Sequence, residues 1–301
     1  MEEESKIIVL GFYKYVKLEN VEKLKMEMKE MCDKLGMRGS ILLAEEGVNA
    51  SVSGTKESME KFKSYLLKIK GFEDLFFKEE KTFEHPFKKM KVKVKDEIVA
   101  FKCDVDLKNA GKHISPDELE DLYECGKLKE NVVILDARND YEYKVGRFKG
   151  AIHLDINVFK DFREKVEELK SEKEKKIVMY CTGGVRCEKA SAYLKTQGFE
   201  DISQLNQGII QFGKEGKKDI WEGKCFVFDK RMVSPMNSEG ESISNCLTCH
   251  KKCDFQRNCK NVNCNLFYIS CLDCESKLHG CCSEECKKIF GRQREKIVSM
   301  K

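Results

Sequence analysis

The chain of 301 residues has a mass of 34.9 kDa and a net charge of +4, from 56 basic and 52 acidic side chains. This length allows two or three domains, and the near balance of charges means that any nucleic-acid surface is a local patch. A mean hydropathy of -0.52 and the lack of an apolar run of about 18 residues exclude a membrane span. The start, MEEESKIIVL, is acidic where a secretory signal is basic, so we expect a cytoplasmic protein without a membrane partner.

The first hundred residues alternate between strand and helix patterns. Strand-like runs are found at residues 6–15, 40–44, 48–53 and, as a start, 75–77. Apolar side chains at helical spacing predict one helix, which Asn20 can cap and Gly36 ends, and a second around residues 59–69. The order βαββαβ predicts a ferredoxin-like (acylphosphatase-like) domain over residues 1–103, and a compact α/β domain of another topology is the alternative.

The segment FKKMKVKVK, residues 87–95, is the sharpest electrostatic feature of this half. As a strand, it turns its apolar side chains to one face and four lysines to the other: Lys89, Lys91, Lys93 and Lys95. Ammonium groups about 7 Å apart suit contact with a phosphate backbone, so these lysines are candidate RNA-binding residues. The alternative is a solvated edge strand that lysines protect from aggregation.

The middle of the chain changes to a pattern of buried strands and helices. A proline-containing capping box at residues 115–118 predicts a helix start, and the apolar runs 131–136 and 176–180 are typical of buried parallel strands. Further helices are predicted at 158–169 and 187–194. Strands alternating with helices predict a parallel α/β domain, assigned to residues 112–231, and the serine-rich stretch 232–245 predicts a linker.

A cysteine lies where one of these buried strands ends. The sequence Cys181-Thr182-Gly183-Gly184-Val185-Arg186 leads through a glycine-bearing loop into a helix. Loop amides, the helix N-terminus and the Arg186 guanidinium all stabilise an anionic sulfur, so we expect a thiolate or persulfide at Cys181. The site also lies at the carboxyl end of a parallel strand, where open α/β sheets bind ligands.

This loop resembles the active-site loop of the rhodanese sulfurtransferases. Upstream, Asp136 and Arg138, with Glu142 and Gly146, resemble the rhodanese signature, although Arg147 stands in place of its histidine. The resemblance gives Asp136 and Arg138 a supporting role. Cys187 either resolves a disulfide or persulfide on Cys181 or packs as a small side chain, and both interpretations stay open. A buried cysteine without chemistry is the alternative for the whole loop.

The end of the chain is dense in cysteine, with ten of the 16 between residues 246 and 286. A large body with few cysteines favours reduced metal-binding thiols over disulfides. Two CxxC pairs are strong zinc patterns, and the candidate ligands are Cys246, Cys249, Cys253, Cys259, Cys264, Cys271, Cys274, Cys282 and Cys286. We expect one or two structural zinc ions within residues 246–290, with the ligand partition open and a contact with RNA as an alternative to a purely structural role.

Longer matches extend the resemblance over nearly the whole chain. The segments ILLAEEGVN (41–49), CTGGVRCEKAS (181–191) and WEGKCFVFDKR (221–231) resemble the rhodanese-like tRNA uridine hydroxylases, with Ala50 where that family tends to have glycine. The resemblance implies an oxygen-dependent enzyme that forms 5-hydroxyuridine at wobble position 34 of tRNA, with Cys181 as the essential cysteine. It implies molecular oxygen as co-substrate, the anticodon stem-loop as partner, and no flavin, haem or nucleotide cofactor.

Three functions are therefore weighed. In a hydroxylase, the Cys181 thiolate adds to C6 of uracil while Arg186 and the loop amides stabilise the charge. In a sulfurtransferase, Cys181 instead carries a persulfide to an acceptor. In a non-catalytic RNA-binding or redox-sensing protein, the cysteines only hold zinc. The sequence indicates neither the electron donor, nor the set of tRNAs, nor the oligomeric state.

Overall fold

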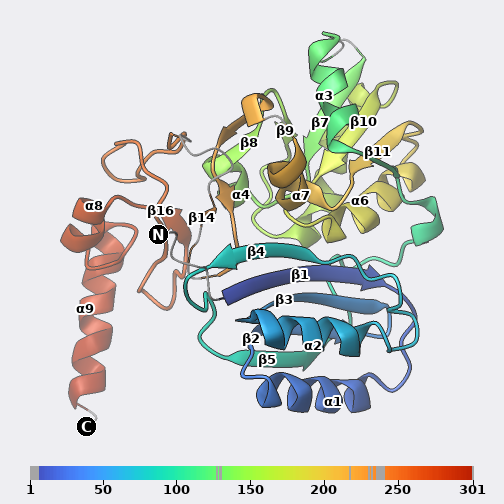
Figure 1. Cartoon of the computed structure of the whole chain (residues 1–301). Helices are drawn as coiled ribbons and strands as arrows, with labels where there is room; N and C mark the ends of the chain where they lie inside the picture. Colours follow the sequence, from blue (N-terminus) through green and yellow to red (C-terminus); the bar gives the residue numbers. More distant parts are fainter. Residues whose placement is uncertain are drawn as a thin grey trace, which may run out of the picture.

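The structure is a computed structural model that describes residues 7–126, 128, 131–216, 218–229, 231, 233–234 and 241–299. Three parts follow one another along the chain (Figure 1). The N-terminal part consists of β1 (Ile7–Tyr15), α1 (Val21–Lys34), β2 (Arg38–Ala44), β3 (Gly47–Thr55), α2 (Lys56–Leu66), β4 (Lys78–Thr82) and β5 (Met90–Val94).

The sheet of this first part has the strand order β4-β1-β3-β2-β5. Its first four strands pair antiparallel, which confirms the predicted ferredoxin-like domain, and β5 extends the sheet by pairing in parallel with β2. Apolar side chains on one face, among them Leu10, Ile41 and Val52, pack against Met28 of α1 and Phe62 of α2. The opposite face is left for the central domain.

Two local expectations in this domain differ from the structure. Asn20 precedes α1 in a left-handed conformation, with φ 50°, and its side chain does not cap the helix. The fourth strand begins at Lys78 rather than at residues 75–77, because Phe72 and Leu75 form a turn whose buried rings and methyl groups pack under the helices.

The central part is a parallel sheet with helices on both faces, as predicted. Its strand order is β6-β11-β10-β7-β9, and every pair is parallel. The elements are η1 (Leu107–Asn109), β6 (Lys112–Ile114), α3 (Pro116–Glu124), β7 (Val132–Asp136), α4 (Asp140–Val145), β8 (Gly146–Phe148), β9 (Ile152–His153), η2 (Phe159–Asp161), α5 (Phe162–Lys165), η3 (Val166–Glu172), β10 (Lys176–Tyr180), α6 (Val185–Thr196), β11 (Ile202–Leu205), α7 (Gly208–Glu215), η4 (Lys218–Ile220) and β12 (Trp221–Gly223).

The segment predicted as one helix over 158–169 is a chain of short helical turns, η2, α5 and η3. Its buried side chains are three residues apart in each pair, Phe159 with Phe162 and Val166 with Leu169. That spacing matches the three residues per turn of a 3₁₀ helix.

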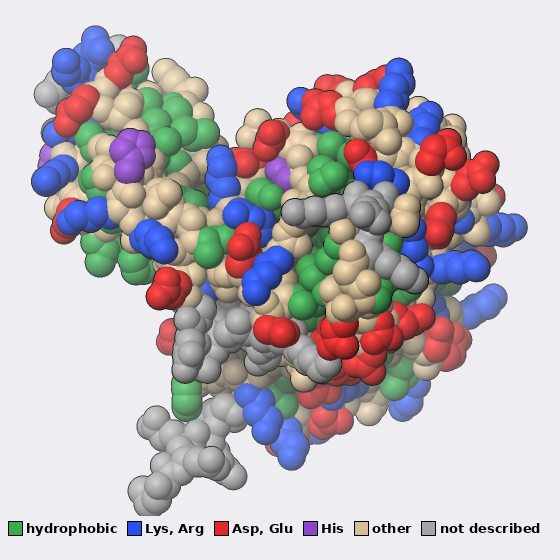
Figure 2. All heavy atoms as spheres, turned by 90° about the horizontal axis from the view of Figure 1, so that it is seen from above, with side chains coloured by type: hydrophobic (Ala, Val, Ile, Leu, Met, Phe, Trp, Pro, Cys, Tyr) green, Lys and Arg blue, Asp and Glu red, His purple; other side chains and the backbone are tan. Residues whose placement is uncertain are grey.

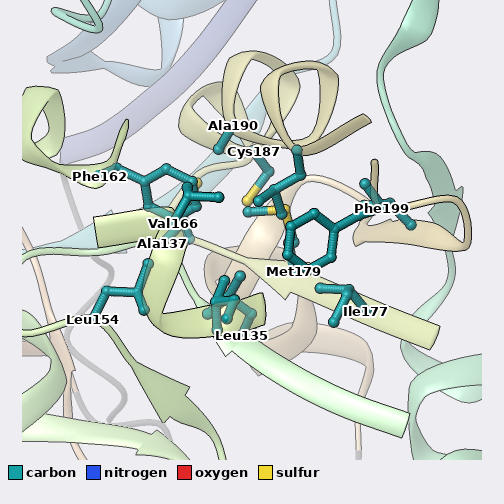
Figure 3. Packing of buried hydrophobic residues seen from close by; sticks show 14 of the residues in the cluster. Leu135, Ala137, Leu154, Phe162, Val166, Ile177, Met179, Cys187, Ala190 and Phe199 are labelled. Carbon is teal, nitrogen blue, oxygen red and sulfur yellow. The ribbon is translucent and has the colours of Figure 1, made fainter. Parts of the chain in front are cut away.

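The core between the sheet and α6 contains the side chains that support the site. Figure 3 shows Leu135 of β7 and Ile177 and Met179 of β10 packed with Cys187 and Ala190 of α6. All five are buried to 0% exposure, so the end of β10 and the start of α6 are held against one another. Close packing of this kind fixes the geometry of the connecting loop.

The cysteine-rich C-terminal part forms a lobe beside the central domain, at the left in Figure 1 and at the upper left in Figure 2. Residues 235–240 of the predicted linker lie outside the described residues, and Val233 and Ser234 form a strand instead. The elements are β13 (Cys225–Phe226), β14 (Val233–Ser234), β15 (Gln256–Asn258), β16 (Phe267–Ile269), α8 (Leu272–Lys277) and α9 (Glu284–Ser299). Over the described ranges, no helix is long and apolar enough to cross a membrane.

Candidate active site

The loop after β10 is built around the sulfur of Cys181. β10 ends at Tyr180, the loop follows at the carboxyl edge of the parallel sheet, and α6 begins at Val185. The backbone N–H of Gly184 donates to Cys181 Sγ at 3.1 Å. Gly184 has φ +99°, and an added Cβ would meet the Tyr13 hydroxyl at 2.8 Å, so this position requires glycine. The inward amide is the one that the sequence predicts.

The sulfur of Cys181 is ionised in this setting. The side chain is fully buried, and burial alone raises its pKa. Hydrogen bonding from the Cys187 thiol, the charge of Arg186 and the backbone N–H groups of Arg186 and Cys187 outweigh that effect and lower the pKa of Cys181 to about 5. At neutral pH the site therefore holds a thiolate inside the protein.

Cys187 is the partner that keeps its proton. Burial, together with the neighbouring thiolate, raises its pKa well above the usual range. Its side chain points into the core below α6 (Figure 3), and its thiol donates to Cys181. Cys187 thus stabilises the anion next to it, and this contact fits both interpretations that the sequence leaves open.

Arg186 is not a lone cation, because a buried carboxylate binds its guanidinium. Glu142 of α4 accepts from Arg186 Nη1 and Nη2, both at 2.7 Å, and from the hydroxyl of Thr182 at 2.9 Å. Glu142 is 0% exposed. This bidentate pair fixes Arg186 and Thr182 in the loop, and Glu142 is a site residue that the sequence indicates only through the rhodanese signature.

The expected supporting residues Asp136 and Arg138 form a second buried ion pair at 2.6 Å. Arg138 also donates to the carbonyl of Gly146 at 2.6 Å, which ties β7 to β8. Arg147, which stands in place of the rhodanese histidine, instead binds Glu222 at 2.6 Å. Both arginines act on the scaffold below the loop rather than on the sulfur.

Two tyrosines of β1 reach from the N-terminal domain to the loop and to α6. The hydroxyl of Tyr13 donates to Glu188 at 3.0 Å, and that of Tyr15 donates to the carbonyl of Val185 at 3.2 Å. Their partners lie more than 150 residues further along the chain. The sequence carries no local signal for such a contact, and neither tyrosine was expected at the site.

Lys78, the first residue of β4, also reaches the loop. Its ammonium donates to the carbonyl of Gly183 at 2.9 Å and to Gln207 Oε1 at 2.7 Å, and it lies 5.0 Å from the centre of the Tyr13 ring. Burial lowers the pKa of Lys78 to about 7, although the Cys181 thiolate opposes that shift. This lysine was not expected at the site either.

A cavity of about 440 Å³ lies between the open face of the N-terminal sheet and the Cys181 loop. Strands β1, β2 and β3 line one side, and the loop with the start of α6 lines the other. Its walls include Gly11, Tyr13, Ser40, Leu42, Asn49, Lys78, Phe87, Thr182, Gly183, Arg186 and Phe228. The volume and the mixture of aromatic and polar groups are those of a site for a small organic group.

The lysine-rich strand lies at the margin of this cavity. β5 is an edge strand whose lysines are exposed and whose Met90, Val92 and Val94 face α1, the alternation that the sequence predicts. Lys91 pairs with Ser40 and Lys93 with Leu42. Paired residues of neighbouring strands point to the same face, so these two lysines extend the cavity-lining face of the sheet. Lys89 and Lys95 are exposed at the two ends of the strand.

The C-terminal lobe gathers eight cysteines into two groups that can each hold one metal ion. The first group contains Cys246, Cys249, Cys271 and Cys274, and the second contains Cys259, Cys264, Cys282 and Cys286. Sulfur atoms 3.6 and 3.7 Å apart occur within the groups. Four thiolates bound at about 2.3 Å to one tetrahedral ion have sulfur separations of about 3.8 Å, so both groups fit such an ion.

Cys253, one of the nine candidate ligands, belongs to neither group. Its side chain is buried and packs with Val145 and Ile269, where the lobe meets α4. Its sulfur does not lie with the four sulfur atoms of either group. Gln256 completes this contact by donating to the carbonyl of Tyr141 at 2.8 Å.

Comparison with known proteins gives matches along the chain. The model of the UPF0176 acylphosphatase like domain matches residues 7–98, that of the Rhodanese-like domain residues 115–215, and that of the Rhodanase C-terminal region residues 222–287. The chain is 43% identical to a tRNA uridine(34) hydroxylase of Cytophaga hutchinsonii, over 93% of this chain and 89% of the relative. It is 40% identical to one of Bacillus licheniformis and 37% identical to one of Chlamydia felis, over 93% of this chain in both and over 88% and 86% of those relatives.

Proposed function

We propose, since the chain belongs to the tRNA uridine(34) hydroxylase family, that it hydroxylates C5 of the wobble uridine of tRNA with molecular oxygen as co-substrate. The observation that carries the proposal is that the loop around the Cys181 sulfur, through Thr182 and Gly183, lines a cavity shared by two domains. With a pKa of about 5, this sulfur is a nucleophile at neutral pH without a separate base.

In the proposed reaction, the thiolate of Cys181 adds to C6 of uracil. This step breaks the C5–C6 π bond and places its electron pair on the enolate of C5 and O4. C5 then bonds to one oxygen atom of O₂, and the other atom leaves as water, with two electrons from a reductant of the thiol class. Loss of the proton on C5 expels the thiolate from C6. Each turnover consumes O₂, two electrons and two protons, and it gives 5-hydroxyuridine and water.

The residues of the loop are placed to stabilise this chemistry. Arg186 is held by Glu142, so its guanidinium cannot swing away as charge develops. The N–H of Gly184 points at the sulfur and stabilises it both as attacking and as leaving group. We assign Cys181 as the nucleophile, Arg186 and the loop residues 182–185 as its electrostatic support, and Asp136 and Arg138 as the scaffold.

The cavity is proposed to receive a uridine that has left the anticodon stack. Its aromatic walls, Tyr13, Phe87 and Phe228, offer surfaces on which a base can lie. Ser40 and Asn49 add hydrogen-bonding groups on the sheet wall, beside Tyr13. Wobble position 34 lies in the anticodon loop, where a base unstacks at lower cost than within a duplex.

The exposed lysines of β5 are proposed to bind the phosphates of the anticodon stem-loop. Lys91 and Lys93 lie on the sheet face that continues into the cavity, so a backbone bound there leads toward Cys181. Phosphate contacts of this kind position a nucleic acid without reading its sequence.

The two four-cysteine groups of the lobe are proposed to hold zinc, two ions per chain. Four thiolates favour zinc among the common cellular ions, and closed Cys₄ sites are structural. The lobe has few large buried apolar side chains of its own, so the metal ions supply the stability that a core would otherwise give.

The test uses the purified chain and an unmodified tRNA transcript that contains uridine at position 34. Incubation in air with a thiol reductant is expected to convert that uridine to 5-hydroxyuridine, as measured by mass spectrometry of the digested nucleosides, whereas the same mixture under nitrogen is expected to give none. In a parallel mixture with thiosulfate as sulfur donor, a product that instead gains sulfur would establish the sulfurtransferase function. An unchanged nucleoside in air would contradict the proposal.

A further inference from the structure

Lys78 is a charged side chain in a place where lysine is rarely found. Its exposure is 3%, and its ammonium is enclosed by the carbonyl of Gly183, the amide of Gln207 and the ring of Tyr13. A buried ammonium is costly unless an anion compensates it. A nearby anion is what allows such a side chain to stay protonated.

The other buried cations of this region already have carboxylate partners. Arg186 binds Glu142, and Lys189 binds Glu46 and Glu97, each at 2.7 or 2.8 Å. Among the described residues, no carboxylate forms an ion pair with Lys78. The sulfur of Cys181, two residues before the Gly183 carbonyl that Lys78 binds, is the anion that acts on it. Glu142 offsets part of the charge of Arg186, and Lys78 is placed to add a second cation beside the thiolate.

We propose that Lys78 is the counter-ion of the Cys181 thiolate, supplied by the N-terminal domain, so that the reactive centre is complete only where the two domains meet. Lys78 is thus a positioning residue, which acts on the reaction through the sulfur. Its effect on hydroxylation rests on the proposed function, whereas its effect on the sulfur itself does not.

Contacts around Lys78 show how the domains share the centre. The carbonyl of Gly183 belongs to the loop that carries Cys181, so the lysine binds the loop next to the sulfur. Gln207 directly precedes α7, and the backbone N–H groups of Ile209 and Ile210 donate to the carbonyls of Cys181 and Thr182 at 3.0 and 3.1 Å. Lys78 therefore links β4 to the two segments that form the walls of the loop.

The charged and titratable groups that face the sulfur come from several elements. They are Lys78 of β4, Tyr13 and Tyr15 of β1, Glu142 of α4, and Arg186, Cys187 and Glu188 of α6, with Lys214 of α7 facing Lys78. The pKa of Cys181 is about 5 and that of Lys78 is about 7. Near pH 5, where the thiolate forms, Lys78 is therefore protonated and can act as its counter-ion.

The test measures how the alkylation rate of Cys181 by iodoacetamide depends on pH in the full-length protein. Trypsin cuts after Lys176 and after Arg186, so the peptide IVMYCTGGVR contains Cys181 and no other cysteine. Mass spectrometry of this peptide isolates one thiol among 16. Limited access of iodoacetamide to the buried sulfur lowers the alkylation rate by the same factor at every pH. The pH at which the rate is half-maximal therefore reports the ionisation of Cys181.

The variant K78M removes the charge, K78R retains it, and K81M changes an exposed lysine of the same strand as the matched control. We expect the midpoint to rise by about one to three pH units in K78M and to stay within about half a unit of wild type in K78R and K81M. Far-UV circular dichroism of the full-length protein checks that each variant is folded, because Lys78 and Lys81 lie in the N-terminal domain and the single tryptophan, Trp221, lies in the central one. A K78M midpoint at the wild-type value, or an equal shift in K81M, would overturn the proposal. If K78M shows the expected shift but the wild-type protein does not hydroxylate tRNA, only the proposed function is refuted.

Discussion

Replacing Glu142 by glutamine tests whether the loop depends on a buried ion pair. Glu142 accepts two hydrogen bonds from Arg186, one from Thr182 and one from the backbone N–H of Asn139, at 2.7–3.1 Å. Glutamine has nearly the same shape but no charge. Its amide NH₂ group, itself a donor, faces the N–H groups of Arg186 or the hydroxyl of Thr182, which are donors as well. The variant thus leaves the Arg186 guanidinium, which is 7% exposed, without its anion.

Breaking a buried pair by removing one partner costs about 3–5 kcal/mol. With a urea dependence of about 1–3 kcal/mol per M, the midpoint of unfolding of this domain is expected to fall by at least about 1 M. Trp221 is buried against Phe148 in the central domain, so its fluorescence follows that domain alone. The control is E168Q, which removes an exposed partner of Lys165 and is expected to change stability by less than about 0.5 kcal/mol.

The difference between E142Q and wild type also has a defined pH dependence. Burial raises the pKa of Glu142, but Arg186 and Arg138 outweigh it and hold the pKa below its usual range. A carboxylate with a lowered pKa stabilises the fold above its unfolded pKa of about 4.3, and this contribution is lost as the pH falls through the folded value. The two proteins are therefore expected to converge in acid. A loss below about 1 kcal/mol at pH 7, matching E168Q, would refute the reasoning.

Three further predictions concern the loop, the metal sites and the RNA surface. Gly208 and Gly126 both have φ +67°, so alanine is equally strained at the two positions. A Cβ at Gly208 would meet the carbonyl oxygen of Cys181 at 2.4 Å, whereas a Cβ at Gly126 would meet no atom within 4 Å. G208A should therefore lose far more hydroxylation activity than G126A in the tRNA assay. In C271S, metal analysis is expected to find one zinc ion per chain instead of two. The control C125S, which changes an exposed cysteine outside the lobe, should retain two. Two zinc ions in C271S would contradict the assignment of Cys271 as a ligand. Replacing Lys91 and Lys93 together by alanine should weaken tRNA binding and lower the slope of log affinity against log salt by about 0.7–0.9 for each lost phosphate contact. The control is K108A, which changes a lysine outside the strand. A slope equal to that of K108A would show that β5 does not bind tRNA phosphates.

Local patterns predicted the parts of the fold that local chemistry determines. The run 176–180 is buried and forms β10, the glycine-bearing loop follows it, and α6 starts after Gly184, whose backbone N–H donates to the sulfur of Cys181. These features are predictable because the strand end, the turn and the helix start are all encoded within a few residues. The alternation of lysines in β5 follows from the period of a strand. The segment 158–169 is helical as predicted, but 3₁₀ turns flank its one α-helical turn, since apolar spacing of three and of four residues is hard to separate over so short a stretch.

The features of the site and of the metal groups that the sequence did not predict depend on contacts between segments far apart in the chain. Lys78 lies in the polar run KEEKT and looks like any solvated lysine until β4 is placed against a loop 105 residues later. The ligand partition is of the same kind, because Cys246 and Cys249 share a group with Cys271 and Cys274 only after β15 and β16 have folded the lobe back. Cys253 lies outside both groups because of where the folded lobe places its sulfur, which no spacing of cysteines contains.

The most direct measurement compares C181S with C125S on the same tRNA in air. C125S is expected to produce 5-hydroxyuridine at the wild-type rate, and C181S to produce none while binding the tRNA with an affinity within about twofold of wild type, since serine lacks an ionised nucleophile at neutral pH. Formation of 5-hydroxyuridine by C181S would contradict the account, because the modification would then occur without the sulfur that the loop is built to hold.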